Sequence, residues 1–330
     1  PAFPADVQAI LSGFAEGVTA VITHHPALLP DWATPDFTPQ DVAARDLRVW
    51  DAGAVRNFLR DRGMERPETG DGVAGSESPE TAHPADETAL LADPDAGSNA
   101  WAFGPERTTS GHSILVRNPH LSYTSGYYEA HMTVPGLLNF YGDYRLGGPF
   151  TIIGGFNDRL GWSTTNNYGD PNQIYALLKD GGSPDEFRFG GDLHPITSRS
   201  VPVDYRSADT LATASNDFRF TSLGPVLFET ADTVYVLKTP TLGRHRLGEQ
   251  WLRMMQANDL EEWKEAMRIQ AKYSSNFTYA DADGNILYVW NATLPLLPHE
   301  PSDGAPVLAH GPEDVWTETL PWDELPQLLN

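Results

Sequence analysis

The stretch DAGSNAWAFG, residues 95–104, decides the fold, because an acidic segment runs into a strand pattern there without an intervening turn. Strand alternation places Ser98 and the alanines after it on one face, and the bulky rings of Trp101 and Phe103 on the other. The small face leaves room for a substrate beside the serine. Cleavage after Gly97 would give Ser98 a free α-amine that can take the proton from its own hydroxyl. The alternative interpretation is an ordinary passage from a linker into a strand.

The segment before this junction, residues 65–97, has the composition of a spacer. Nine carboxylates accompany a single arginine, Arg66, among many Gly, Pro, Ser, Thr and Ala. Its few apolar side chains cannot offset the entropy of ordering, so we expect the spacer to be mobile and open to proteases. It divides the chain into a helical segment (1–64), an acidic flexible spacer (65–97) and a β-rich region (98–330).

The segment 1–64 carries helical periodicity. Apolar residues recur at three- and four-residue steps over residues 6–25, which predicts an amphipathic helix. A second helix is predicted to begin at Pro39, which suits the first helical position, with Thr38 as its cap. Its apolar pattern continues towards Gly63.

Short strands predominate after residue 97. Apolar and β-branched runs bounded by Gly, Pro, Asn and Asp predict strands at 113–117, 127–134, 150–153, 173–178, 233–238 and 286–290. One helix interrupts them, from about Asn258, a capping residue type, to Ala271. Residues 277–281 and 286–290 flank an Asp-Gly turn and predict a β-hairpin.

The composition excludes several classes of function. Asp and Glu number 45 against 22 Lys and Arg, and the net charge of −23 repels nucleic acid and anionic membrane surfaces. The absence of cysteine removes disulfides, thiolate nucleophiles, Cys-ligated zinc and iron–sulfur clusters. No stretch approaches about eighteen consecutive apolar residues, and the first residues lack the pattern of a secretion signal. We therefore expect a soluble chain without a signal.

Several blocks of the sequence resemble the penicillin acylase family. Those in the β-rich region keep the order and spacing of the start of that family's β chain: SNAWAFG (98–104), NPHL (118–121), YEAHMTVPG (128–136), IGGFND (153–158) and LGWSTTN (160–166). The later stretch NFTYADADGNI (276–286) is similar to the family's Asn-x-x-Tyr-Ala-Asp-x-x-Gly-Asn-Ile segment. Residues 6–60 resemble, less specifically, the helical part of the α chain.

The resemblance implies a fold and a mechanism. The family consists of N-terminal nucleophile hydrolases with an α+β fold, an αββα sandwich of two stacked, mainly antiparallel sheets between helices. Its members are inactive precursors that cleave themselves, excise a spacer and expose a serine that hydrolyses N-acyl amides. The resemblance makes Gly97 and Ser98 the processing site, and Ser98 both nucleophile and, through its freed amine, general base. It implies that His120 holds this amine, and that the Asn166 backbone N–H and the Asn276 side-chain amide stabilise the oxyanion.

The chain departs from the family pattern in three places. Where the family usually carries a small or branched apolar residue, Asn166 makes the pocket wall more polar. The family's α chain begins with strands bearing an Arg-Asp-x-x-Gly-x-Pro-type segment and its β chain continues well beyond the equivalent of Asn330. We therefore expect a chain shortened at both ends, with an incomplete sandwich. Asp170 lies where family members hold a calcium ligand, but the carboxylate expected three residues later is Gln173. A structural calcium ion at Asp170 is thus an expectation, and the reaction requires no cofactor.

The sequence as a whole predicts an autoprocessed N-acyl amide hydrolase. Its small-molecule substrate would be a penicillin, an acyl-homoserine lactone or a lipopeptide-type amide, and the block at 128–136 together with His120 favours the last two. After self-cleavage the α and β chains would form a heterodimer, and the resemblance implies a secreted or periplasmic location. The rival hypothesis is a truncated, unprocessed β-rich binding or scaffold relative of the family. An unrelated acidic β-sandwich would make every matching block a coincidence.

Overall fold

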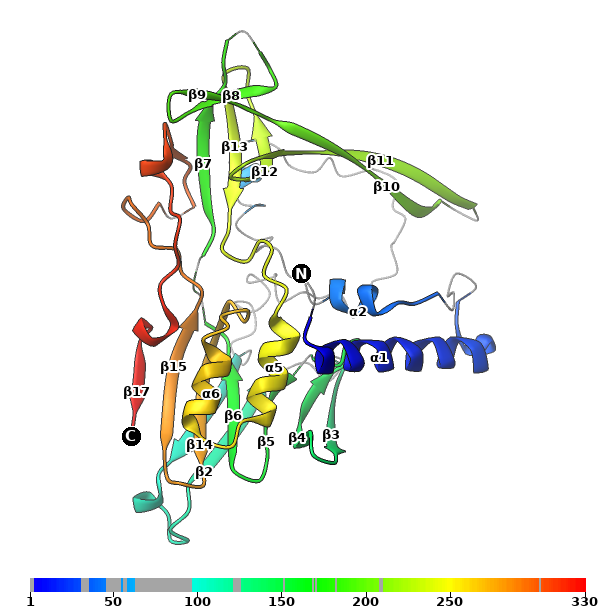
Figure 1. The fold of residues 1–330 in the computed structure, drawn as a ribbon, viewed down its shortest axis with the longest axis vertical. Coiled ribbons are helices and arrows are strands. Elements are labelled where there is room, and N and C mark those ends of the chain that lie inside the picture. The colour runs from blue at the N-terminus through cyan, green and yellow to red at the C-terminus, as the bar shows by residue number, and fades with distance from the viewer. Residues whose placement is uncertain are drawn as a thin grey trace.

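The structure is a computed structural model that describes residues 3–30, 36–45, 55, 58–62, 97–120, 126–150, 152–167, 169, 171–181, 183–207, 210–302 and 304–330. The predicted spacer, apart from Gly97, and the predicted calcium ligand Asp170 lie outside these residues. Figure 1 shows two main sheets, one above the other in the view, with most of the helices beside the lower one.

The lower sheet has seven strands, and neighbouring strands in it run antiparallel. Across the sheet they are β17 (Gln327–Leu329), β15 (Ile286–Ala292), β14 (Ser274–Asp281), β6 (Leu160–Thr165), β5 (Ile152–Phe156), β4 (Leu138–Arg145) and β3 (Tyr127–Val134). The predicted hairpin is confirmed as β14 and β15. Its turn is held by Asp281 Oδ1, which accepts the backbone N–H groups of Asp283 and Asn285 at 3.0 and 2.8 Å. Gly284 takes a φ of +96°, which favours glycine.

Two helices, α5 (Leu247–Gln256) and α6 (Leu260–Met267), pack on one face of this sheet and form the main core with it (Figure 1). Trp263 of α6 is fully buried at the centre of this core. Its ring centroid lies 5.1 Å from that of Tyr279 and 5.8 Å from that of Phe277, both on β14. Aromatic packing thus fixes α6 directly over β14.

The helix predicted from Asn258 to Ala271 is shorter than expected, and a second helix was missed. The side chain of Asp259, not Asn258, caps α6 by accepting the backbone N–H of Glu262 at 2.9 Å. The helix ends at Met267, and Gln270 takes a φ of +51°. The missed helix α5 buries apolar residues at helical spacing, among them Trp251 and Met255.

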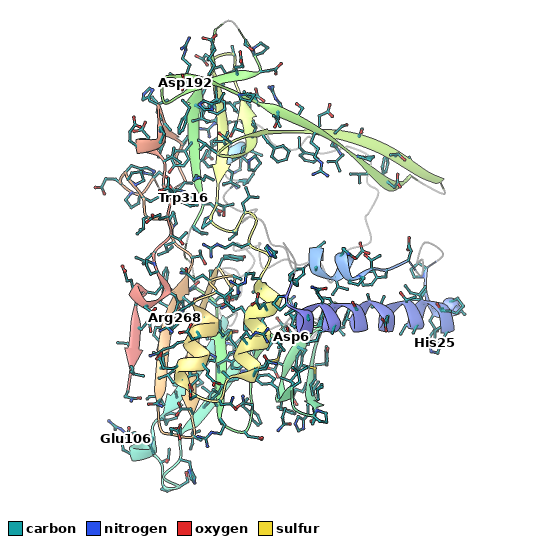
Figure 2. All side chains as sticks on the ribbon, viewed as in Figure 1. Asp6, His25, Glu106, Asp192, Arg268 and Trp316 are labelled. Carbon is teal, nitrogen blue, oxygen red and sulfur yellow. The ribbon has the colours of Figure 1, made fainter. Side chains whose placement is uncertain are left out.

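The first N-terminal helix is confirmed, and the second begins where expected, but its described part ends at Arg45. In α1 (Ala5–His24), Val7, Leu11 and Ala15 recur at four-residue steps and are buried in the main core. Asp6 at its start accepts two hydrogen bonds from Arg253 of α5, the shorter at 2.6 Å, and Figure 2 shows Asp6 beside that helix. Among the described residues, α1 is the one helix long and apolar enough to cross a membrane.

The second N-terminal helix, α2 (Pro39–Arg45), begins at the predicted proline. Thr38 Oγ1 accepts the backbone N–H of Asp41 at 3.3 Å, and Asp41 Oδ2 accepts that of Thr38 at 2.8 Å. This reciprocal pair is the cap expected from the sequence. The short 3₁₀ turn Pro26–Leu28 lies between the two helices in the chain.

The upper sheet has six strands. In order they are β10 (Thr197–Ser207), β11 (Thr210–Thr221), β12 (Gly224–Glu229), β13 (Thr233–Lys238), β7 (Gln173–Leu178) and β16 (Val307–Leu308). Neighbours are antiparallel except β7 and β16, which run parallel. The small hairpin β8 (Glu186–Phe189) and β9 (Asp192–Pro195) packs against this sheet through Phe187. The strands β7 and β13 have the predicted bounds, whereas the long ribbon β10–β11, which Figure 1 shows extending away from the sheet, was not anticipated.

A separate hairpin, β1 (Gly97–Phe103) and β2 (Ile114–His120), packs on β6 and β14 of the seven-stranded sheet. The described residues therefore form an α+β fold with stacked antiparallel sheets. The α5–α6 pair, the seven-stranded sheet and this hairpin form three successive layers, and the complete αββα sandwich stays a prediction. On the hairpin's outer face Trp101 is 45% exposed and Phe103 42% exposed. The part of the chain that the structure describes thus adds no second helical layer there.

Candidate active site

Ser98 lies at the beginning of β1, directly after the predicted cleavage position. Its Oγ donates a hydrogen bond to the Gly97 carbonyl oxygen at 2.6 Å. Gly97 has a φ of +152°, a backbone conformation that residues other than glycine rarely adopt. The hydroxyl is therefore in contact with the carbonyl group of the bond that the sequence analysis expects to be cut.

The face of the hairpin that carries Ser98 is turned towards the seven-stranded sheet. Leu115 and Arg117, on the same hairpin face, lie against Gly161 and Gly154 of the sheet. A Cβ on Gly154 would come within 2.9 Å of Arg117 Nε, so the missing side chain makes this close approach possible. The small face of β1 thus borders the sheet, and the aromatic face is the one open to solvent.

An ion pair ties the hairpin to the sheet. Arg117 Nη2 lies 2.6 Å from Asp143 Oδ2 on β4, and both side chains are largely buried. Burial makes such a contact costly to break, because either group alone would be left uncompensated. The pair therefore holds β2 in place over the sheet.

His120 lies across the hairpin from Gly97, and Pro119 lies across from Ser98. The Nε2 atom of His120 lies 3.2 Å from Asn99 Nδ2 and 2.9 Å from Asn118 Nδ2, so this ring nitrogen accepts hydrogen bonds from both side-chain amides. Strand alternation puts the side chain of His120 on the face opposite to that of Ser98. The structure thus brings His120 beside the Gly97–Ser98 bond rather than beside the serine hydroxyl.

The two predicted oxyanion donors are neighbours. Asn276 on β14 pairs in register with Thr165 at the end of β6, and Asn166 follows. Asn276 Nδ2 donates to Asn166 O and to Thr165 Oγ1, each at 2.9 Å. The Tyr288 hydroxyl donates to Asn276 Oδ1 at 3.0 Å, which fixes which end of the amide is the donor. Because β1 packs on β6 and β14, these groups belong to the surface that the hairpin covers.

The expected metal ligand Asp170 lies outside the described residues. Gln173 is buried, and its Oε1 accepts from Ser302 Oγ at 3.2 Å. Among the described residues, no group of three His, Asp or Glu side chains is arranged to hold a metal ion. Calcium at Asp170 therefore stays a prediction.

Sequence reasoning missed the residues that position the predicted ones. Asn99, Asn118, Thr165 and Tyr288 each contact a predicted site residue. For the two asparagines a signal was present, since they flank the nucleophile and histidine within the quoted blocks. Tyr288 carried no local signal, because only the pairing of β14 with β15 brings it to Asn276.

Comparison with known proteins places this site in a family. A family model described as penicillin amidase matches residues 2–330. Among curated relatives, the acyl-homoserine lactone acylase PvdQ of Pseudomonas fluorescens is 28% identical over 309 residues, 88% of this chain and 39% of its own length. The aculeacin-A acylase of Actinoplanes utahensis is 29% identical over 68% of this chain and 30% of its own length. The penicillin G acylase of Escherichia coli is 26% identical over 71% of this chain and 27% of its own length.

A solved structure with a similar fold also matches this chain. The thermostable penicillin G acylase from Alcaligenes faecalis matches with a TM-score of 0.61 and 23% identity, over 70% of this chain and 42% of that chain. At this identity the likeness concerns the fold alone. The chain spans 39% of the length of the first curated relatives it matches.

Proposed function

Because the chain belongs to the penicillin amidase family, with a match over residues 2–330, we propose that it carries the nucleophile of an N-acyl amide hydrolase. The observation that carries the proposal is the contact of Ser98 Oγ with the Gly97 carbonyl oxygen at 2.6 Å, on a hairpin that packs on the strands of Asn166 and Asn276. This serine thus lies next to the bond to be processed, on a hairpin that packs on the strands leading to the candidate oxyanion donors.

Processing comes first in this proposal. The Ser98 hydroxyl attacks the Gly97 carbonyl carbon, an ester bond forms, the Gly97–Ser98 amide bond breaks, and the hydroxyl proton passes to the released amine. Water then hydrolyses the ester and leaves Ser98 at a chain terminus.

Hydrolysis of substrate uses the same hydroxyl. The freed α-amine of Ser98 takes the hydroxyl proton while Oγ attacks the carbonyl carbon of an N-acyl amide. The Asn166 N–H and the Asn276 amide stabilise the oxyanion, the amine product leaves with a proton, and water releases the acyl group from the serine. His120 acts here as a positioning residue for the amine, supported by its register opposite Gly97.

We infer the class of substrate from the names of the relatives. Relatives are named for acting on acyl-homoserine lactones, aculeacin A and penicillin G. For this chain we propose a small-molecule N-acyl amide, processing into an α/β heterodimer, and an exported location. Helix α1 is long and apolar enough to cross a membrane, but three of its residues are buried in the core. This helix therefore does not decide where the protein is located.

The test is hydrolysis of amides of graded acyl length by the purified protein and by its Ser98→Ala variant, with the intact mass of each preparation. If the proposal is correct, the wild-type protein is processed and hydrolyses at least one amide. The Ser98→Ala variant is neither processed nor active. The rival scaffold hypothesis expects both chains to stay uncleaved, with masses that differ only by the oxygen atom that the substitution removes, and no hydrolysis by either.

A further inference from the structure

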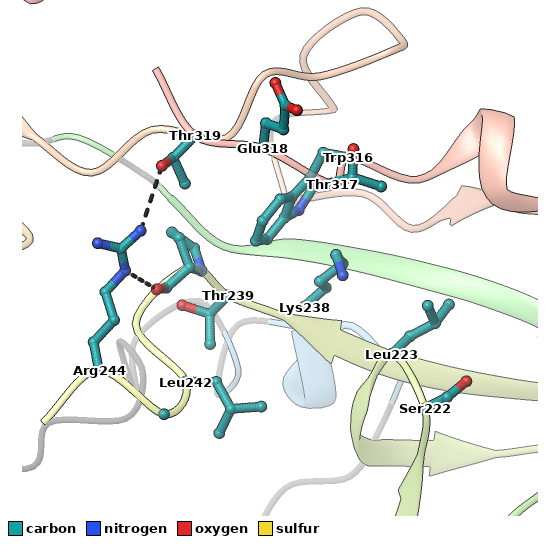
Figure 3. Close-up of a pocket in the computed structure, with 12 residues that line it drawn as sticks. Ser222, Leu223, Lys238, Thr239, Leu242, Arg244, Trp316, Thr317, Glu318 and Thr319 are labelled. Atoms are coloured by element: carbon teal, nitrogen blue, oxygen red, sulfur yellow. Dashed lines mark hydrogen bonds between the residues drawn. The ribbon is translucent and has the colours of Figure 1, made fainter. Parts of the chain in front are cut away.

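A cavity of about 680 Å³ lies away from the candidate active site, at the end of the six-stranded sheet. Its walls come from the end of β13, the loop before α5 and the segment 316–319 (Figure 3). Neither Ser98, His120, Asn166 nor Asn276 lines it. The volume falls in the range of small-molecule pockets, roughly 300–1,000 Å³.

Two cations line this cavity in a protein whose net charge is −23. Lys238 and Arg244 form no ion pair with any described carboxylate, although the described chain holds many such pairs elsewhere. The Lys238 ammonium lies 4.5 Å from the centroid of the Trp316 ring. Arg244 donates only to neutral oxygens: Pro240 O at 2.8 Å, and Gln270 O and Thr319 Oγ1 at 3.4 Å.

Burial without a counter-charge leaves both cations poorly solvated. It lowers the pKa of the Lys238 ammonium and of the Arg244 guanidinium, because desolvation disfavours the charged form. Glu318 is the one carboxylate on the cavity wall, and Figure 3 shows it pointing away from both cations. An anion bound between the two cations would replace the missing counter-charge.

A third group on the same wall lacks a partner. Trp316 is 7% exposed, and its indole N–H is buried without a hydrogen-bond acceptor. The wall also has an apolar part, since Leu223 and Leu242 line it beside the indole ring.

We propose that this cavity binds a small organic molecule that bears a carboxylate. The carboxylate accepts from Lys238 and Arg244, and the apolar part of the molecule lies against the Trp316 ring and the two leucines. A cavity of this volume has room for such a body as well as for the charged group. The site is independent of the proposed amide hydrolysis, because the two share no residue.

The test uses the indole N–H resonance of Trp316 in ¹⁵N-labelled protein, assigned by its loss in Trp316→Phe. Benzoate is the probe, benzamide is its uncharged analogue, and acetate is the carboxylate without an apolar body. We expect benzoate to move this resonance downfield and saturably, acetate to do so at higher concentration, and benzamide to leave it unmoved. No movement with benzoate, or an equal movement with benzamide, overturns the proposal.

Variants separate this cavity from any other site for benzoate. Lys238→Gln combined with Arg244→Gln should weaken binding by about tenfold or more, since each loses a charged hydrogen-bond donor. Arg159→Gln, which removes one positive charge at an exposed ion pair with Asp283, should leave the affinity unchanged. Unchanged binding by the double variant overturns the proposal. If the double variant does not fold, the charge-preserving Lys238→Arg variant and Glu318→Gln replace it. Lys238→Arg should retain benzoate binding and Glu318→Gln should tighten it slightly. Loss of benzoate binding in both variants overturns the proposal.

Discussion

Asn276 donates its side-chain amide to the backbone carbonyl oxygen of Asn166 at 2.9 Å. The same amide also donates to Thr165 Oγ1, so both of its N–H groups already have protein acceptors. Under the proposed function an oxyanion has to draw one N–H away from these partners. The contact from the Tyr288 hydroxyl to Asn276 Oδ1 keeps the donor end of the amide in place during this exchange.

Replacement of Asn276 therefore tests the oxyanion role. In processed protein, Asn276→Ala should lower kcat for amide hydrolysis about a hundred- to a thousandfold, as expected for loss of one oxyanion donor. Tyr288→Phe is the matched control, because it removes one hydrogen bond to Asn276 but leaves both amide N–H groups. It should lower kcat far less. An Asn276→Ala enzyme that works at the wild-type rate would exclude this residue from the oxyanion site.

The Gly97–Ser98 bond is expected to be cut by the protein itself. Intact mass and N-terminal sequencing of purified wild-type protein should find a chain that begins Ser98-Asn99-Ala100-Trp101. Ser98→Ala should give a single chain of 36.2 kDa, because no hydroxyl is left to attack. Ser110→Ala, an exposed serine of the same hairpin, should be processed normally. Cleavage of the Ser98→Ala chain at the same bond would assign the cut to another protease.

The Asp6–Arg253 pair should make stability depend on pH. The hydrogen bond from Arg253 lowers the pKa of Asp6 below its ordinary value of 3.8 in the folded state. Its contribution is therefore present above about pH 4 and is lost as pH falls through the lower folded-state pKa. Asp6→Asn should lower the free energy of unfolding by about 1 kcal/mol at pH 7, because the pair is partly exposed. The difference between wild type and variant, from urea titrations at pH 7, 5 and 3, should shrink towards the lowest pH. A constant difference would show that charge plays no part.

The core under α6 depends on Trp263. Its complete burial between Tyr279 and Phe277 predicts a loss of about 3–5 kcal/mol in unfolding free energy for Trp263→Ala. Trp101→Ala makes the same chemical change at a ring that is 45% exposed, so it should cost much less. Urea unfolding followed by far-UV circular dichroism measures both, and equal losses would contradict this assignment of the core.

Gly155 should tolerate no side chain. A Cβ there would collide with the backbone oxygen of Tyr141 and with Gly142, which belong to the adjacent strand β4. Gly155→Ala should therefore destabilise the sheet strongly. Gly13→Ala is the control: a Cβ on this residue of α1 meets nothing within 4 Å, and alanine should stabilise the helix by about 0.5–1 kcal/mol. Thermal melts of the two variants should move in opposite directions, and a Gly155→Ala melting temperature at or above that of wild type would refute the prediction.

Local patterns predicted much of the secondary structure. The cap at Thr38, the Asp-Gly turn after Asp281 and the short apolar strand β7 all depend on residues a few positions apart, and each was found where expected. The prediction failed where a short pattern was ambiguous. The helix α5 was missed, and α6 is capped one residue later and ends earlier than its apolar pattern predicted.

The sequence by itself determined the family, the nucleophile candidate and the strand that carries it, because these depend on contiguous blocks of residues. Only the tertiary structure decided what surrounds them. The pairing of β14 with β6 brings Asn276 to Asn166, and the packing of the hairpin lays the strand of Ser98 on β6 and β14. The cavity of Lys238, Arg244 and Trp316 likewise assembles from segments far apart in the chain. Such contacts follow from the burial of a shared core, to which every strand and helix contributes at once, and no local spacing in the sequence encodes them.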